Sequence, residues 1–146
     1  MAGGLQRLVR RDILTRLKQD AFVTALVPST SIYSQATPKE PKWPFIKTGA
    51  VQSIPIRGAC MDGATVNISV HGFSRGRYNA SGSLVETAED HASRIGAAIE
   101  DCLDAKGATL TTGERVRYRL TDVQLLVDGG EPDAFHYFAN VSARVL

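Results

Sequence analysis

The sequence predicts an α+β fold, in which a long central helix and an N-terminal helix pack on a four-stranded antiparallel or mixed sheet. Two observations predict the helices: apolar residues recur three or four apart over 5–19 and over 83–106. A third predicts the strands, because apolar and polar residues alternate over 64–73 and 135–146. The order is helix, short helix, two strands, long helix, two strands, and such an open sheet leaves edge strands free to pair between copies.

The totals are those of a globular protein with one domain spanning 1–146. Apolar residues make up 43% of the 146 residues and charged residues 22%, and no apolar run approaches the roughly 18 residues that a membrane span requires. We find no apolar signal-peptide core, so we expect no export from the cytoplasm. Two cysteines, Cys60 and Cys102, are too few for a disulfide framework and are expected to be reduced thiols.

The first predicted element is an amphipathic helix over 5–19, followed by a short turn of helix over 21–27 that Asp20 caps and Pro28 closes. The helix carries Arg7, Arg10 and Arg11 on its polar side. A charged helix side is usually only the solvated side, and we prefer that interpretation. Binding of nucleic acid or of a membrane by this basic helix is the alternative.

The next region contains an extended connector and two strands. A short strand is expected at 31–33, and three prolines at 38, 41 and 44 then prevent regular pairing. Strands are expected at 45–54 and 64–73, separated by turn chemistry from Pro55 to Gly63. The segment from Ser74 to Gly82 reads as a polar mobile loop.

The central helix is expected to run from Ser83 to Lys106. Ser83 is the predicted N-cap, Glu86 its capping-box partner three residues later, and Gly107 the stop. At 1.5 Å per residue this helix would be roughly 36 Å long, enough to cross one face of a small sheet.

The C-terminal region predicts a hairpin of two long strands, 116–127 and 135–146, joined by a turn over 128–134 that contains two glycines. The apolar phase of the first strand slips by one residue between Leu120 and Val123. An extra residue near Asp122, a β-bulge, would produce this slip.

The sequence contains few candidate catalytic or metal-binding residues. Of the three histidines, His71 and His136 are expected on the polar side of their strands, and all three, including His91, are expected at the surface. The sequence contains no spacing typical of a metal site, no nucleophile elbow and no P-loop. We therefore expect no enzyme, no metal and no cofactor, and we keep a small cytoplasmic enzyme that uses His71 or His136 as an alternative.

Charge is unevenly distributed along the chain. Residues 1–77 contain 11 Lys/Arg against 4 Asp/Glu, and residues 78–146 contain 6 against 11. One interpretation is a chance asymmetry. The other is a pair of oppositely charged surfaces, one from each half, that allow head-to-tail contact between copies.

A resemblance covers nearly the whole chain. It rests on the helix ending in "D-AFVTALV", the connector "SIYSQATPKEPKWPFI", the strand "ATVNISVHGFSR", the helix "ETAEDHASRIGAAIEDCLD" and the final pair "VRYRLTDVQLLVDGGEPDAFHYFANVSARV". In this order of elements the chain resembles the tail-completion or tail-terminator proteins of long-tailed phages and of phage-like gene transfer agents.

The resemblance implies a virion structural protein of the tail or neck, assembled in the host cytoplasm. It implies a homo-hexameric ring that caps the tail tube protein, ends polymerisation and joins the tube to the head-tail connector or stopper protein. DNA would pass through the lumen without specific binding, and no membrane would be involved. Candidate contacts to the tube, the connector or a neighbouring subunit are Arg57, Arg75, Arg77, Asp128, Glu131 and Asp133. A head-side neck stopper or adaptor is the alternative within this class.

Overall fold

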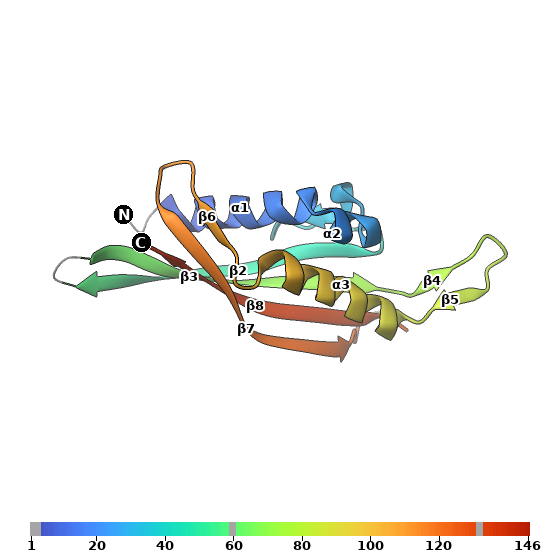
Figure 1. Cartoon of the computed structure of the whole chain (residues 1–146). Helices are drawn as coiled ribbons and strands as arrows, with labels where there is room; N and C mark the ends of the chain where they lie inside the picture. The colour runs from blue at the N-terminus through green and yellow to red at the C-terminus, as the bar shows by residue number, and fades with distance from the viewer. Residues whose placement is uncertain (1–3, 59–60, 131–132) are drawn as a thin grey trace.

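The protein is an elongated two-layer α+β structure, seen in a computed structural model that describes residues 4–58, 61–130 and 133–146 (Figure 1). The helices are α1 (Leu5–Gln19), α2 (Ala21–Leu26) and α3 (Ala88–Leu103), with a 3₁₀ turn at Ser29–Ser31. The strands are β1 (Ile32–Tyr33), β2 (Phe45–Gly58), β3 (Met61–Ser74), β4 (Arg77–Tyr78), β5 (Leu84–Glu86), β6 (Gly107–Thr109), β7 (Arg115–Val127) and β8 (Phe135–Val145).

The main sheet has six strands in the described part of the chain, in the order β1-β2-β3-β8-β7-β6, and not the four that the sequence predicted. β1 runs parallel to β2, and all other neighbours are antiparallel. The two additional strands, β1 and β6, have two and three residues. Strands this short carry too little alternation to be separated from loop, although one was expected at 31–33 without a place in the sheet.

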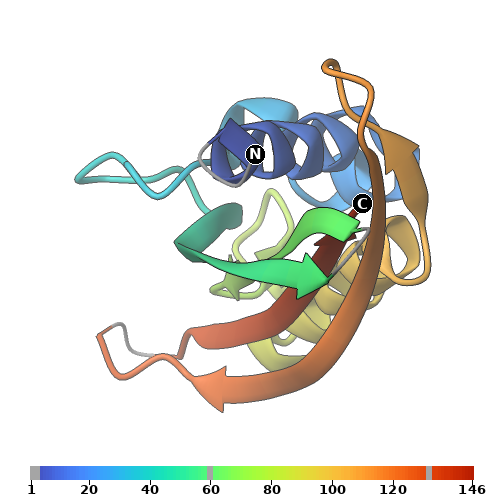
Figure 2. The ribbon, with the colours of Figure 1, turned by 90° about the vertical axis from the view of Figure 1, so that its left-hand side faces the viewer.

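The helices cover one face of the sheet (Figure 1). α1 lies over β2 and β3, and α3 lies over β3, β8 and β7. Figure 2 looks along the long axis and shows the sheet strongly curved, with β7 arching away from its short partner β6. Between the layers lies a continuous core of aliphatic side chains from α1, α3, β3, β7 and β8.

The N-terminal helices form as predicted. α1 spans Leu5–Gln19 and buries Leu5, Val9, Ile13 and Leu17. Asp20 caps α2, because its Oδ1 accepts hydrogen bonds from the backbone N–H groups of Phe22 (3.0 Å) and Val23 (2.9 Å).

The central helix begins later than predicted and is shorter. α3 starts at Ala88, with Thr87 as its N-cap accepting a hydrogen bond from the Asp90 N–H at 3.2 Å. Ser83 is therefore not the cap and Glu86 not a capping-box partner, because Leu84–Glu86 form β5 and pair with β4. The helix ends at Leu103, and Ala105 follows with a φ of 58° before Gly107 opens β6. Its 16 residues correspond to roughly 24 Å.

The predicted turn from Pro55 to Gly63 is also wrong. β2 continues to Gly58 and β3 begins at Met61, so the two strands form a ribbon that projects beyond the rest of the sheet (Figure 1). β1 pairs only with Ile46 and Lys47, so the outer edge of β2 is open at Pro55. A proline lacks an N–H donor and is tolerated on such an open edge.

The predicted bulge in β7 is confirmed. The register between β7 and β8 shifts between Leu120 and Asp122, and Val123 then pairs with Ala139. The extra residue returns apolar side chains to the helix-covered face of the sheet.

Two glycines allow α3 to lie close to the sheet. A Cβ on Gly96 would lie 2.3 Å from ring carbons of Tyr137, and one on Gly72 would lie 2.8 Å from Cγ2 of Ile95. The buried Tyr137 ring fills the space that the missing Gly96 side chain leaves. The position of α3 on the sheet therefore depends on these two residues.

We predict that Gly96→Ala destabilises the protein. The higher helix propensity of alanine contributes about 1 kcal/mol of stability, whereas overpacking against Tyr137 costs about 1–3 kcal/mol. Because a Cβ only 2.3 Å from the ring carbons places the overpacking cost in the upper half of this range, chemical denaturation should show a net loss of roughly 1–2 kcal/mol. The control is Gly129→Ala, where a Cβ meets nothing within 4 Å. A Gly96→Ala protein as stable as wild type would contradict the close packing.

Candidate interaction surfaces

Two β-ribbons project from opposite ends of the molecule (Figure 1). At one end is the tip of β2 and β3. At the other is the β4–β5 hairpin, which begins directly after Ser74 at the end of β3. Each ribbon extends beyond the helix layer (Figure 1).

The β4–β5 hairpin is anchored to α3 and exposes apolar side chains. Glu86 bonds Arg94 at 2.7 Å and Arg77 at 3.3 Å, which ties the hairpin to the helix. Three large apolar residues project from it and are more than half exposed: Tyr78 (59%), Leu84 (55%) and Val85 (56%). Exposed apolar side chains gathered on one projection are typical of a protein contact site.

The predicted contact residues lie at both ends. Arg57 is exposed on the β2–β3 ribbon. Arg77 lies on the hairpin at the other end, and the Arg75 guanidinium stacks 4.3 Å above the Trp43 ring. Asp128 and Asp133 lie in the turn between β7 and β8, which is at the hairpin end because Phe135 pairs with Ser74. The sixth predicted residue, Glu131, lies outside the described residues.

A group of arginines that the sequence analysis did not single out lies on the sheet surface away from the helices. Arg115, Arg117 and Arg119 alternate along β7 with the buried Val116 and Tyr118. Arg144 on β8 lies directly opposite Arg117. We call the four arginines of β7 and β8 the arginine face. Within the described residues none of them makes an ion pair.

The signal for this group was present in the sequence. "RVRYR" over 115–119 places three arginines two residues apart. In a strand this period puts all three on one side of the sheet. Only the pairing of β7 with β8 adds Arg144 beside them.

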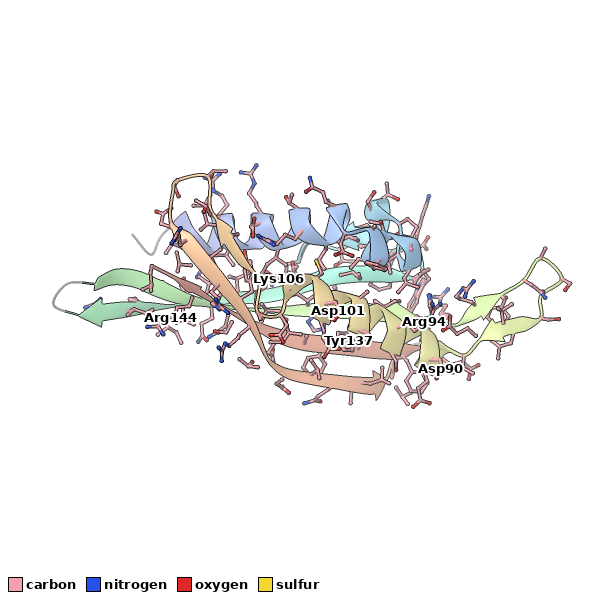
Figure 3. All side chains as sticks on the ribbon, in the orientation of Figure 1. Asp90, Arg94, Asp101, Lys106, Tyr137 and Arg144 are labelled. Atoms are coloured by element: carbon pink, nitrogen blue, oxygen red, sulfur yellow. The ribbon has the colours of Figure 1, made fainter. Side chains whose placement is uncertain are left out.

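Acidic residues gather on the opposite side of the molecule, at the C-terminal end of α3. Glu100, Asp101 and Asp104, which we call the α3 carboxylate cluster, line a shallow surface hollow together with Ala97 and Lys106. Partial burial, and then the charges of Asp101 and Asp104, raise the pKa of Glu100 above its ordinary value. Figure 3 shows Asp101 on the side of α3 turned away from the sheet, and Arg144 toward the end of the molecule that carries the β2–β3 ribbon.

The arginine face and the α3 carboxylate cluster thus lie on opposite faces of the molecule. Both come from residues 78–146, the half of the sequence with an excess of acidic residues. Strands from both halves are neighbours in one sheet, because β3 pairs with β8. These two clusters therefore do not correspond to the basic first half and the acidic second half of the sequence.

The histidines are more buried than predicted. His91 on α3 is only 2% exposed, and its Nδ1 is 2.7 Å from the hydroxyl of the buried Ser74. His71 and His136 are half-buried and lie side by side, with Nδ1 of His71 2.7 Å from Nε2 of His136. Nε2 of His71 is 2.8 Å from the Ser69 hydroxyl. Burial and then the charges of His136 and Lys47 lower the pKa of His71 to about 4.

The two strand histidines belong to a packed aromatic cluster. Their rings stack 4.9 Å apart, and the His136 ring lies 4.3 Å from that of Phe73, which in turn stacks on Phe45. Trp43 closes the row edge-on at 4.9 Å from Phe45. Both nitrogens of His71 are engaged by protein groups, so the pair serves packing. Among the described residues no three His, Cys, Asp or Glu side chains are placed to hold a metal ion.

The described cysteine is an inert thiol. Cys102 is buried on α3 and free, and burial raises its pKa to about 11. A thiol held protonated is a poor nucleophile. Cys60 lies outside the described residues.

Comparison with known families decides the identity of this fold. The sequence profile described as "Tail completion protein gp17" matches residues 11–146, nearly the whole chain. The chain belongs to this family. Family membership makes it a structural protein of phage tails and not an enzyme, so the alternative of an enzyme using His71 or His136 is wrong.

Solved structures share the fold of this tail-completion protein. A chain from a structure described as "Virion of native gene transfer agent (GTA) particle" matches with a TM-score of 0.70 and 19% identity, covering 91% of this chain and 90% of that one. A second structure, whose description states no function, matches with a TM-score of 0.56 and 16% identity over 97% and 95% of the two chains. No curated protein matches the sequence.

No helix in the described part of this tail-completion protein is both long and apolar enough to cross a membrane.

We predict that the stability of this tail-completion protein decreases as the pH falls from about 6.5 to about 4. Folding keeps His71 neutral with a pKa of about 4, whereas the unfolded chain binds a proton near the usual value of 6.5. Protonation therefore favours the unfolded chain in this window. At about 1.4 kcal/mol per pH unit the effect would reach roughly 3 kcal/mol, and partial solvent screening reduces it to about 1–2 kcal/mol.

Urea unfolding at pH 7 and pH 4.5 measures this effect, with His71→Gln as the comparison. The glutamine amide retains a donor and an acceptor for His136 and Ser69 but does not titrate. Carboxylates and the other histidines are present in both proteins. The loss of unfolding free energy between pH 7 and pH 4.5 should therefore be larger in wild type than in His71→Gln, and the difference isolates His71. An equal loss of unfolding free energy in the two proteins would contradict the lowered pKa of His71.

Proposed function

We propose that this protein is the terminator of a phage-type tail. Six copies form a ring that caps the tail tube protein, ends tube polymerisation and joins the tube to the head-tail connector or stopper protein. DNA passes through the lumen without specific binding. The ring is assembled in the host cytoplasm and becomes part of the virion.

The observation that carries this proposal is the pair of ribbons at opposite ends of an elongated subunit (Figure 1). A protein that joins two different assemblies needs one contact surface for each. The β2–β3 ribbon, with Arg57, and the β4–β5 hairpin, with Arg77, Tyr78 and Leu84, provide two such surfaces of different chemistry. A ring of such subunits would present all ribbons of one kind on each of its two sides.

The subunit flanks support ring formation. The outer edge of β7 is paired with β6 only at Arg115–Arg117, so Thr121–Val127 has an open edge in the described structure. The apolar side chains Val123 (44%) and Val127 (68%) are exposed along it. An open edge with exposed apolar residues favours contact with another chain.

Removing the protein from particle-producing cells tests the proposal. Without a terminator the tube should continue to polymerise, so electron microscopy should show overlong tails unattached to heads. A neck stopper or adaptor is the second candidate, although the tail-completion family favours the tail side. Unattached tails of normal length would favour the stopper and contradict the terminator.

We predict that the double variant Leu84→Asp, Val85→Asp blocks one junction of the ring. Carboxylates on the exposed hairpin would oppose burial of this surface against a neighbour. Electron microscopy of particles should show loss of either head joining or tube capping, whereas the purified variant should keep the wild-type mass. Thr111→Asp, in the exposed turn before β7, is the control. Intact attachment at both junctions would contradict the assignment of the hairpin.

A further inference from the structure

We propose that neighbouring copies of this chain dock head to tail, with the arginine face of one subunit on the α3 carboxylate cluster of the next. This inference rests on the proposed ring and identifies the surfaces that build it. Neither surface makes an ion pair within the described residues.

The arginine face brings like charges together. Arg117 on β7 pairs directly with Arg144 on β8, so the two side chains lie next to each other on the same face of the sheet. Arg117, Arg119 and Arg144 also line one surface hollow, together with Thr65 and Ser142. Like charges placed directly opposite each other in a sheet are destabilising, and an acidic partner relieves this repulsion.

The α3 carboxylate cluster brings negative charges together. Glu100, Asp101 and Asp104 crowd the last turn of a helix, where the helix dipole disfavours negative charge. Asp104 is partly engaged, since its Oδ1 accepts a hydrogen bond from the Leu120 N–H at 3.0 Å. Glu100 and Asp101 have no ion pair within the described structure. Lys106 and the small side chain of Ala97 also line this hollow.

The arginine face and the α3 carboxylate cluster have complementary charge and hydrogen-bonding groups. Guanidinium groups bind carboxylates through two parallel hydrogen bonds, which gives orientation as well as attraction. Beside Glu100 a second hollow is lined by Val123, Leu125 and Tyr137, so the carboxylates border an apolar strip. An apolar strip beside paired charges is the usual composition of a protein interface.

The arrangement favours a second copy over any other occupant. The arginine face lies on the sheet surface away from the helices, and the carboxylates lie at the C-terminal end of α3 on the helix-covered face, so they cannot neutralise each other within one subunit. A contact between two different patches of the same chain repeats from copy to copy, and it closes into a ring when the rotation between copies permits. This is the geometry that the proposed ring needs.

Charge exchange tests the inference. One variant carries Arg117→Glu and Arg144→Glu, and the other carries Glu100→Lys and Asp101→Lys. Each variant alone opposes like charges at every contact and should remain near the 15.7 kDa monomer mass. An equimolar mixture restores opposite charges when the two variants alternate, and alternation closes only in a ring with an even number of subunits. Light scattering should then give about 94 kDa, six copies of the 15.7 kDa chain.

The control is Arg7→Glu with Arg11→Glu, a matched double reversal on the exposed side of α1. It should keep the wild-type mass, and circular dichroism checks that all variants are folded. If wild type is a ring and both charge variants also form rings alone, the inference is wrong and the proposed function stands. If wild type is a monomer at 100 µM and absent from particles, both are wrong.

Nucleic-acid binding by the arginine face is tested in the same experiment with a fluorescent 30-base-pair duplex. The inference predicts that Arg117→Glu with Arg144→Glu changes the mass. A variant of wild-type mass that has lost salt-dependent duplex binding would overturn it and assign the arginines to DNA.

Discussion

The close approach of α3 to the sheet determines most of what this protein presents to its neighbours. Gly72 and Gly96 remove two side chains at the contact, and the Tyr137 ring occupies the space against Gly96. With that side of α3 fixed, Ala92, Ile95, Ile99 and Leu103 enter the core. The 3.6-residue period then turns Asp101 outward. The acidic surface is therefore a consequence of packing, as is the separation of this surface from the arginines on the far side of the sheet.

The lengths of the strands explain how one sheet both carries the core and extends into ribbons at its ends. Its middle, where β2, β3, β8 and β7 overlap, carries the core beneath the helices. β2 and β3 then run on past the helices at one end, and the chain leaves β3 into the β4–β5 hairpin at the other. The aromatic cluster of Phe45, Phe73 and His136 braces the sheet near the hairpin end on the side that has no helix. A stiff body with ribbons at both ends suits the proposed joining of two assemblies.

Residue spacing predicted the features of the fold that depend on neighbouring residues in the sequence. α1, the Asp20 cap and the β7 bulge follow from residue spacing, and the structure confirms each. The start of α3 could not be predicted in this way, because Ser83 and Thr87 both offer a capping side chain. Pairing of β5 with β4, and the bonds from Glu86 to Arg94 and Arg77, select the later start. The arginine face likewise depends on the partner of β7, and His91 is buried in contact with Ser74, 17 residues away in sequence.

The central claim is that the two charged surfaces meet between subunits of a ring. Electron cryomicroscopy of the assembled wild-type ring, at a resolution that shows side chains, measures this directly. The account predicts six copies, with Glu100 and Asp101 of each within hydrogen-bonding distance of Arg117 and Arg144 of the next. A ring in which the arginines line the lumen and the outer side of α3 faces solvent would contradict it.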